Sequence, residues 1–202
     1  MHGLHPELTV AMSGMMDKID AVLGRGGYSG EPVQMYLAGG MAVHYHCGTR
    51  YTDDVDATFS HRLLLPYEEL TVAYLRADTT PAAIYLDPTY NDTFALIHPD
   101  HREAATEWEG IGNERRLVHL RVFTPLDLAV SKIARFSEDD QADILALASH
   151  RFFTSSQLQA HAHEALDYYV GDTRWIHLNL AQISEEMDSR WPSREPCPPA
   201  FP

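Results

Sequence analysis

Cysteine and long apolar segments are both scarce in this chain of 202 residues. Its two cysteines, Cys47 and Cys197, are too few for a disulfide framework, so we expect a reducing, cytoplasmic environment. No apolar run is long enough to span a bilayer, and the first residues lack the basic and apolar segments of a secretory signal. These absences exclude a disulfide-rich scaffold and predict no membrane partner.

Positive charge is also scarce. The chain has 15 lysines and arginines against 29 aspartates and glutamates, which gives a net charge of -14. Such a surface repels long polyanions, so we expect no DNA partner, although one basic groove would be enough to hold a tRNA. The densest basic group is Arg115, Arg116 and Arg121, and solvated or ion-paired arginines are its simplest interpretation.

Residues 1–124 are predicted to form an α/β core. A helix is expected over residues 7–23, because apolar side chains recur there at steps of four and three. The other elements expected in this half are, in chain order, a strand at Val33–Ala38, a short helix at Met41–Cys47 that ends at Gly48, a strand at Thr52–Phe59, a helix at Pro66–Arg76, and strands at Ala82–Asp87 and Leu117–Phe123. Residues 88–114 are expected to be largely loop, with His98 and His101 at the surface.

Residues 125–190 are predicted to form a C-terminal helical region. Thr124 is a favourable N-cap with Pro125 at the first helical position, and Ser137 and Thr154 are favourable N-caps for the next two helices. Asp172 or Thr173 begins a fourth helix, and residues 191–202 form an irregular Pro-rich tail. The predicted fold class is therefore α/β (α+β), a short mixed sheet flanked by helices and followed by a helical bundle.

Two aspartates lie one residue apart in the predicted strand Thr52–Phe59. Side chains alternate along a strand, so Asp54 and Asp56 lie on one face and Val55 on the other. Two close carboxylates repel each other, and a divalent cation removes that repulsion. Mg²⁺ prefers one or two carboxylates together with waters and phosphate oxygens. The pair therefore indicates a magnesium site, although a D-x-D pair also occurs on solvated strand faces.

A glycine pair lies at the other end of the same stretch. Gly39 and Gly40 connect a predicted strand to a predicted helix, where backbone N–H groups are available to bind phosphate. If the short helix folds back, the glycines and the aspartates meet at one edge of the sheet. That arrangement suits a nucleoside triphosphate held by its phosphates, with metal beside them. A glycine pair alone indicates only a turn.

These residues resemble a known signature. Leu37-Ala38-Gly39-Gly40, followed by Arg50, Thr52, Asp54, Val55 and Asp56, resembles the motif of the DNA polymerase β-type nucleotidyltransferase superfamily, in particular its minimal bacterial AbiEii-like branch. Pro125–Leu147 resembles the second conserved block of that branch, with Lys132, Asp140 and Asp143 at its matching positions. The two blocks cover less than half of the chain.

The resemblance implies a nucleotidyltransferase fold and Mg²⁺-dependent transfer of a nucleotide from a nucleoside triphosphate, with pyrophosphate as the leaving group. Asp54 and Asp56 would hold two Mg²⁺ ions, and Gly39 and Gly40 would hold the β- and γ-phosphates. Arg50, Thr52, Lys132 and Asp143 would complete the nucleotide site. For Lys132 the alternative is a surface lysine on an amphipathic helix, and for Asp143 it is a helix surface.

Catalysis in this superfamily usually needs a third carboxylate on a neighbouring strand. Asp87 is the candidate, although Asp87-Pro88 also has the composition of a turn. Without that carboxylate the chain would be a degenerate binding module that acts through a partner protein. The resemblance further implies a toxin–antitoxin or phage-defence component, with a cognate antitoxin as partner and a protein or RNA as acceptor. A third interpretation is a helical interaction protein with a structural α/β half.

Overall fold

The structure, a computed structural model, describes residues 6–48, 52–92 and 95–192. In these ranges it contains seven α-helices, one 3₁₀ helix and seven strands in two small mixed sheets, which confirms the predicted mixed α/β class. The chain divides into two compact units. The first unit contains the chain up to Asn91 together with Ala105–Val122, and the second contains Asp92–Ala104 and the chain from Phe123 onward.

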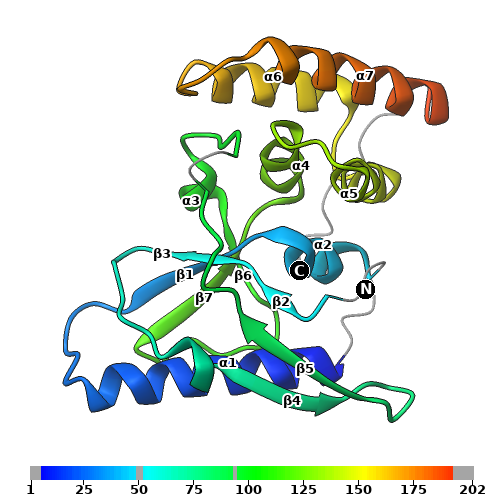
Figure 1. The fold of residues 1–202 in the computed structure, drawn as a ribbon. Helices are drawn as coiled ribbons and strands as arrows, with labels where there is room; N and C mark the ends of the chain where they lie inside the picture. Colours follow the sequence, from blue (N-terminus) through cyan, green and yellow to red (C-terminus); the bar gives the residue numbers. More distant parts are fainter. Residues whose placement is uncertain (1–5, 49–51, 93–94, 193–202) are drawn as a thin grey trace. The chain divides into compact units, whose positions relative to one another are not determined.

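The first unit carries both sheets and two helices (Figure 1). Its elements are α1 (Pro6–Arg25), β1 (Val33–Leu37), α2 (Gly39–Cys47), β2 (Asp54–Val55), β3 (Ala57–Phe59), the 3₁₀ helix η1 (Tyr67–Glu69), β4 (Thr71–Leu75), β5 (Pro81–Leu86), β6 (Thr106–Glu107) and β7 (Val118–Val122). The larger sheet has the strand order β3-β1-β7-β6, in which only the β1–β7 pair is parallel. The smaller sheet has the order β2-β5-β4, with β2 parallel to β5.

The core of the first unit lies between α1 and the strands. The apolar stripe of α1, including Met12, Met15 and Ile19, is fully buried, and α1 contacts β4, β5 and β7. On β7 the alternate residues Val118 and Leu120 are buried, as the period of a strand requires. The helix predicted over 7–23 is confirmed, because an apolar face repeated at 3.6 residues is buried against a sheet.

Two predicted elements of the first unit are wrong. The single strand at Thr52–Phe59 is interrupted at Asp56, where the chain passes from β2 in the smaller sheet to β3 in the larger one. The helix at Pro66–Arg76 is replaced by η1 and strand β4. The segment Thr71–Leu75 alternates in burial and pairs antiparallel with β5, because its β-branched and aromatic residues favour an extended chain beside a partner strand.

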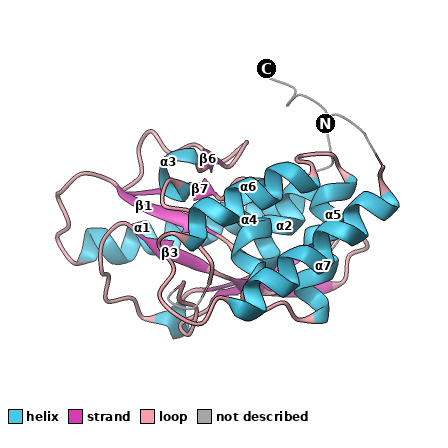
Figure 2. Ribbon diagram, turned by 90° about the horizontal axis from the view of Figure 1, so that it is seen from above, coloured by secondary structure: helices cyan, strands magenta, loops and turns pink. Residues whose placement is uncertain are grey.

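The second unit is helical. It contains α3 (His101–Ala104), α4 (Pro125–Ile133), α5 (Glu138–Ser149), α6 (Ser155–Leu166) and α7 (Arg174–Arg190). The predicted caps are confirmed: the Thr124 side chain accepts from the N–H of Asp127, and Ser137 and Thr154 each form a capping box. Helices α6 and α7 run side by side, and both contact α4 or α5 (Figure 2).

Three further findings concern predictions made from the sequence. His98 and His101 are buried rather than at the surface, with 6% and 8% of their area exposed. None of the helices in the described ranges has both the length and the apolar character needed to cross a membrane. The predicted irregular tail lies, from residue 193 onward, outside the described residues.

Candidate functional site

The glycine pair and the second aspartate come together at the start of α2. Gly39 has a backbone φ of +60°, a left-handed conformation that glycine adopts without strain. A Cβ atom at Gly39 would lie 1.8 Å from Oδ2 of Asp56, so the Asp56 carboxylate fills the space that any other residue would occupy. The N–H of Ala38 donates to the Asp56 carbonyl at 2.8 Å, which fixes the two segments side by side.

Thr52 lies against the second glycine. A Cβ at Gly40 would lie 3.4 Å from Cγ2 of Thr52, a close but ordinary contact. The Thr52 hydroxyl accepts a hydrogen bond from the N–H of Asp54 at 3.3 Å and so helps to shape the turn into β2. Because the first N–H groups of a helix have no acceptor within it, the N-terminus of α2 presents donors beside this turn.

The burial of the side chains alternates from Asp54 to Ala57, as it does along an extended chain. Asp54 and Asp56 are half-buried, whereas Val55 and Ala57 between and after them are buried. Asp54 pairs in register with Tyr85 of the parallel strand β5. A hydrogen bond to the Asp54 carboxylate and its negative charge raise the pKa of the Tyr85 hydroxyl.

Asp87 directly follows β5, the strand beside β2. Its N–H donates to the carbonyl of Val55 at 3.1 Å, so the β2–β5 ladder extends to Asp87. Alternation along β5 places Asp87 on the side of Tyr85, where its charge also raises the pKa of that hydroxyl. Oδ1 of Asp87 accepts from the N–H and the hydroxyl of Thr89, at 2.7 and 2.8 Å. Both predicted features, a turn and a carboxylate on a neighbouring strand, are therefore present.

Gly39→Ala is expected to lower the free energy of unfolding by about 1–3 kcal/mol, because alanine strains the left-handed backbone and displaces the Asp56 carboxylate. Chemical denaturation of the purified protein measures this change. Gly24→Ala is the matched control, since no atom lies within 4 Å of a Cβ at Gly24 in α1. If Gly39→Ala and the wild type are equally stable, the close packing of Gly39 on Asp56 does not contribute to the stability of the fold.

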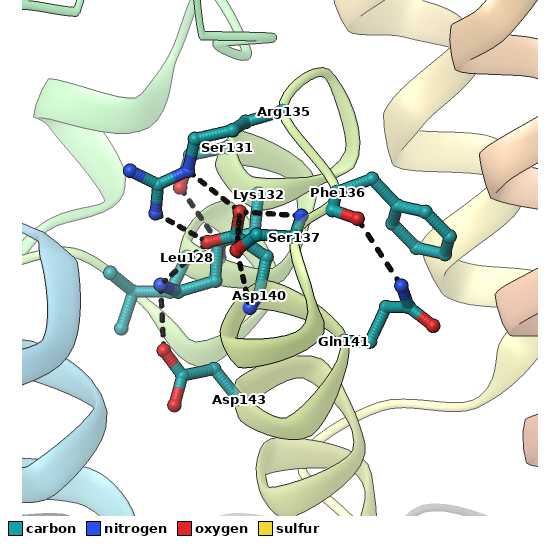
Figure 3. A network of polar contacts seen from close by, with 9 residues as sticks. All are labelled: Leu128, Ser131, Lys132, Arg135, Phe136, Ser137, Asp140, Gln141 and Asp143. Carbon is teal, nitrogen blue, oxygen red and sulfur yellow. Dashed lines mark hydrogen bonds and ion pairs between the residues drawn. The ribbon is translucent and has the colours of Figure 1, made fainter.

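Lys132 and its acidic partners form a buried charged network in the second unit (Figure 3). The Lys132 ammonium lies 2.8 Å from Oδ2 of Asp143 and 3.5 Å from Oδ1 of Asp140. Lys132 is 6% exposed and Asp143 is 3% exposed, so the alternatives of a surface lysine and a surface aspartate are both wrong. The burial of the long lysine stem follows from its position on the inner face of α4, among Leu128, Ala129 and Ile133.

Asp140 is the most enclosed member of the network. Arg135 donates to both of its oxygens, at 2.6 and 2.7 Å, and the Ser137 N–H and hydroxyl donate to Oδ2. Burial raises the pKa of this carboxyl, but the hydrogen bonds from Arg135 and Ser137 and the charge of Lys132 outweigh it and lower the pKa to about 2. Asp140 is therefore ionised across the physiological range and anchors the start of α5.

The predicted site residues fall into two groups. The first unit holds Gly39, Gly40, Thr52, Asp54, Asp56 and Asp87, whereas the second holds Lys132, Asp140 and Asp143. Arg50 lies outside the described residues. Sequence reasoning missed Tyr85, although the alternation in Ala82–Asp87 places it on the side of Asp87. It also missed a buried group formed by His98, Asp127 and His161, for which no local spacing gives a signal.

Two comparisons with known proteins found no relative of this chain. No protein-family model matches the chain, and the search of curated proteins finds no match.

Proposed function

We propose that this protein is a Mg²⁺-dependent nucleotidyltransferase with the nucleotidyltransferase fold, which transfers a nucleotide from a nucleoside triphosphate to a protein or RNA acceptor. The observation that carries the proposal is the packing of the Asp56 carboxylate on Gly39 at the N-terminus of α2, with the half-buried Asp54 two residues before it in the chain. This arrangement combines phosphate-binding donors and cation-binding carboxylates within one short segment.

The donor set fits magnesium. Asp54, Asp56 and Asp87 offer carboxylate oxygens only, and hard oxygen ligands are those that Mg²⁺ prefers. When bound, Mg²⁺ would neutralise charge on the triphosphate and on the leaving pyrophosphate. Asp54 and Asp56 would hold two ions, and Asp87 would supply the third carboxylate on the neighbouring strand.

The remaining roles concern the substrate. The N–H groups at Gly39 and Gly40 would bind the β- and γ-phosphates, because a helix N-terminus favours anions. The absence of a side chain at Gly39 lets the Asp56 carboxylate lie against the backbone at the start of α2. In the proposed reaction the acceptor hydroxyl oxygen would form a bond to the α-phosphorus and its proton would pass to solvent. The bond from the α-phosphorus to the oxygen that bridges it to the β-phosphate would break, and pyrophosphate would leave. Arg50, Thr52, Lys132 and Asp143 stay predicted members of the nucleotide site.

A second candidate is a degenerate binding module that acts through a partner protein. The observation that favours it is the use of Asp87 Oδ1 in the turn to Thr89, which leaves the third carboxylate engaged by two donors. The partner in either case would be a cognate protein such as an antitoxin, as the resemblance implies.

Thermal unfolding with Mg²⁺ and each nucleoside triphosphate in turn tests the proposed function. A ligand at about a hundred times its dissociation constant stabilises by roughly 2.7 kcal/mol, so the correct nucleotide is expected to raise the unfolding temperature by several degrees. The increase is expected to require Mg²⁺ and to disappear in Asp54→Ala/Asp56→Ala.

The matched control for this experiment is Asp53→Ala. Asp53 is an exposed neighbour of the pair, and one of its oxygens lies 3.5 Å from the Arg76 guanidinium. This variant is expected to keep the nucleotide-dependent stabilisation. No increase with any nucleotide would overturn the proposed site, and the aspartates would then be a solvated strand face.

A further inference from the structure

A second group of ligand-type side chains lies within the helical unit. His98 precedes α3, Asp127 lies in the first turn of α4, and His161 lies on α6. Each offers one ligand atom, and these three atoms lie within 4.8 Å of one another. The Asp127 and His98 side chains are 1% and 7% exposed, and that of His161 is 21% exposed. Three segments far apart in the chain therefore meet at one mostly enclosed point.

Hydrogen bonds and ring stacking fix the positions of these three side chains. Nε2 of His161 lies 2.8 Å from Oδ1 of Asp127, and the two imidazole rings of His98 and His161 stack at 3.8 Å. The other oxygen of Asp127 accepts from the Thr124 hydroxyl at 2.5 Å. Such a hydrogen bond from outside the ligand shell orients a ligating carboxylate.

We propose that His98, Asp127 and His161 bind a single transition-metal ion of the Zn²⁺ class. Two imidazoles and one carboxylate are a ligand set that Zn²⁺ accepts, whereas Mg²⁺ selects oxygen ligands. A divalent cation would also stabilise a negative charge on the Asp127 carboxyl, together with the contacts that Thr124 and His161 already make to it. None of these residues belongs to the predicted nucleotide site, so this metal site is independent of the proposed function.

Glu164 extends the group towards solvent. It lies one helical turn after His161 on the same face of α6, and its Oε2 lies 3.0 Å from Nε2 of His98. Its side chain is 66% exposed, so it is the member of the group at the solvent side. A carboxylate hydrogen-bonded to a metal-ligating histidine fixes the ring and raises its basicity. We therefore place Glu164 outside the ligand set, as the positioning residue for His98.

Binding requires a small rearrangement of the group. Ligand atoms around a tetrahedral Zn²⁺ lie roughly 3.4 Å apart, given bonds of about 2.0–2.1 Å. The 2.8 Å between Nε2 of His161 and Oδ1 of Asp127 must therefore lengthen, and a separation near the upper limit of 4.8 Å must shorten. The N–H of Asp100 donates to Nδ1 of His98 at 3.2 Å, a long bond that a modest ring movement breaks. A ring proton on Nε2 of His161 must leave that atom when the metal binds there, either by moving to Nδ1 of the same ring or by passing to solvent.

Titration of the untagged, metal-stripped full chain with Zn²⁺ alone tests this proposal. Isothermal titration calorimetry is expected to show one zinc ion per chain, and the Co²⁺-substituted protein is expected to show the visible absorption of a nitrogen- and oxygen-ligated ion. His161→Ala and His98→Ala are each expected to weaken binding by more than the roughly 10- to 100-fold that loss of an outer-shell partner costs. Glu164→Gln, at an exposed position, is expected to fall within that range.

The controls separate this site from surface histidines and from the nucleotide site. His163→Ala removes an exposed histidine of the same helix, and Asp54→Ala/Asp56→Ala removes the proposed magnesium ligands. Both variants are expected to bind zinc as the wild type does. Circular dichroism establishes that each variant is folded. The proposal is overturned if the wild type binds no zinc, or if folded His161→Ala binds it as tightly as His163→Ala does.

Discussion

Replacing Lys132 with methionine is expected to lower the free energy of unfolding by about 3–5 kcal/mol. The change removes the cation that lies 2.8 Å from Asp143 and 3.5 Å from Asp140, inside a network with almost no solvent exposure. Methionine keeps the length and apolar stem of lysine. The expected decrease in the free energy of unfolding therefore comes from loss of charge rather than from loss of volume. Urea denaturation followed by circular dichroism measures the difference.

The chain offers a matched control, because it contains only one other lysine, Lys18. Lys18 is exposed on α1 and donates one hydrogen bond to the carbonyl of Glu69 at 2.9 Å. Lys18→Met is expected to change stability by less than about 1 kcal/mol, as for other exposed charged groups. If the two variants are equally stable, the buried network does not hold α4 and α5 together.

Asp56→Asn is expected to reduce nucleotide transfer by about 10²- to 10³-fold, the scale on which loss of a charge-stabilising group lowers turnover. Asparagine has nearly the same shape and can occupy the space above Gly39, so the fold is expected to survive. What is lost is a negative charge among the proposed magnesium ligands. The measurement is incorporation of α-labelled nucleotide into the protein or RNA of a cell extract, using the nucleotide identified by thermal unfolding.

Asp53→Asn is the control for this assay, since Asp53 is adjacent in sequence and exposed. It is expected to label acceptors as the wild type does. Labelling by Asp56→Asn at the wild-type rate would contradict the proposed mechanism. A wild-type protein that binds nucleotide with Mg²⁺ but labels no acceptor would instead support the degenerate binding module.

Local signals in the sequence were sufficient for most of the helices. Thr124, Ser137 and Thr154 were predicted as N-caps, and each caps a helix in the structure. A cap depends on a side chain and backbone N–H groups two or three residues away, so it is fully encoded within a short segment. The same holds for Gly48, whose left-handed backbone ends α2.

The strands were predicted less well because their partners lie elsewhere in the chain. The segment Thr71–Leu75 is extended only because β5 pairs with it across the turn in which the N–H of Arg76 donates to the carbonyl of Thr80. The break at Asp56 arises because β2 and β3 pair with strands of different sheets. The break has no signature within its own segment, and the β-branched and aromatic residues of Thr71–Leu75 favour a strand only where a partner strand lies beside them.

In the candidate site, too, contacts within a short segment could be predicted from the sequence, whereas contacts between distant segments could not. Proximity of Gly39 and Asp56 followed from the short strand–helix–strand connection, because few residues separate them. Burial of Lys132 could not be read from its helix alone, since its partners Asp140 and Asp143 lie on the following helix. The meeting of His98 with His161 depends on how a loop packs on α6, and no spacing in the sequence encodes it.

The burial of Lys132 also determines how the protein responds to amine-directed chemistry. Acylating reagents modify lysine side chains that solvent reaches, and of the two lysines only Lys18 is exposed. The folded chain therefore offers one reactive lysine and the unfolded chain offers two. Peptide-level mass spectrometry after a brief acylation pulse thus records the opening of the α4–α5 pair as the appearance of an adduct on Lys132.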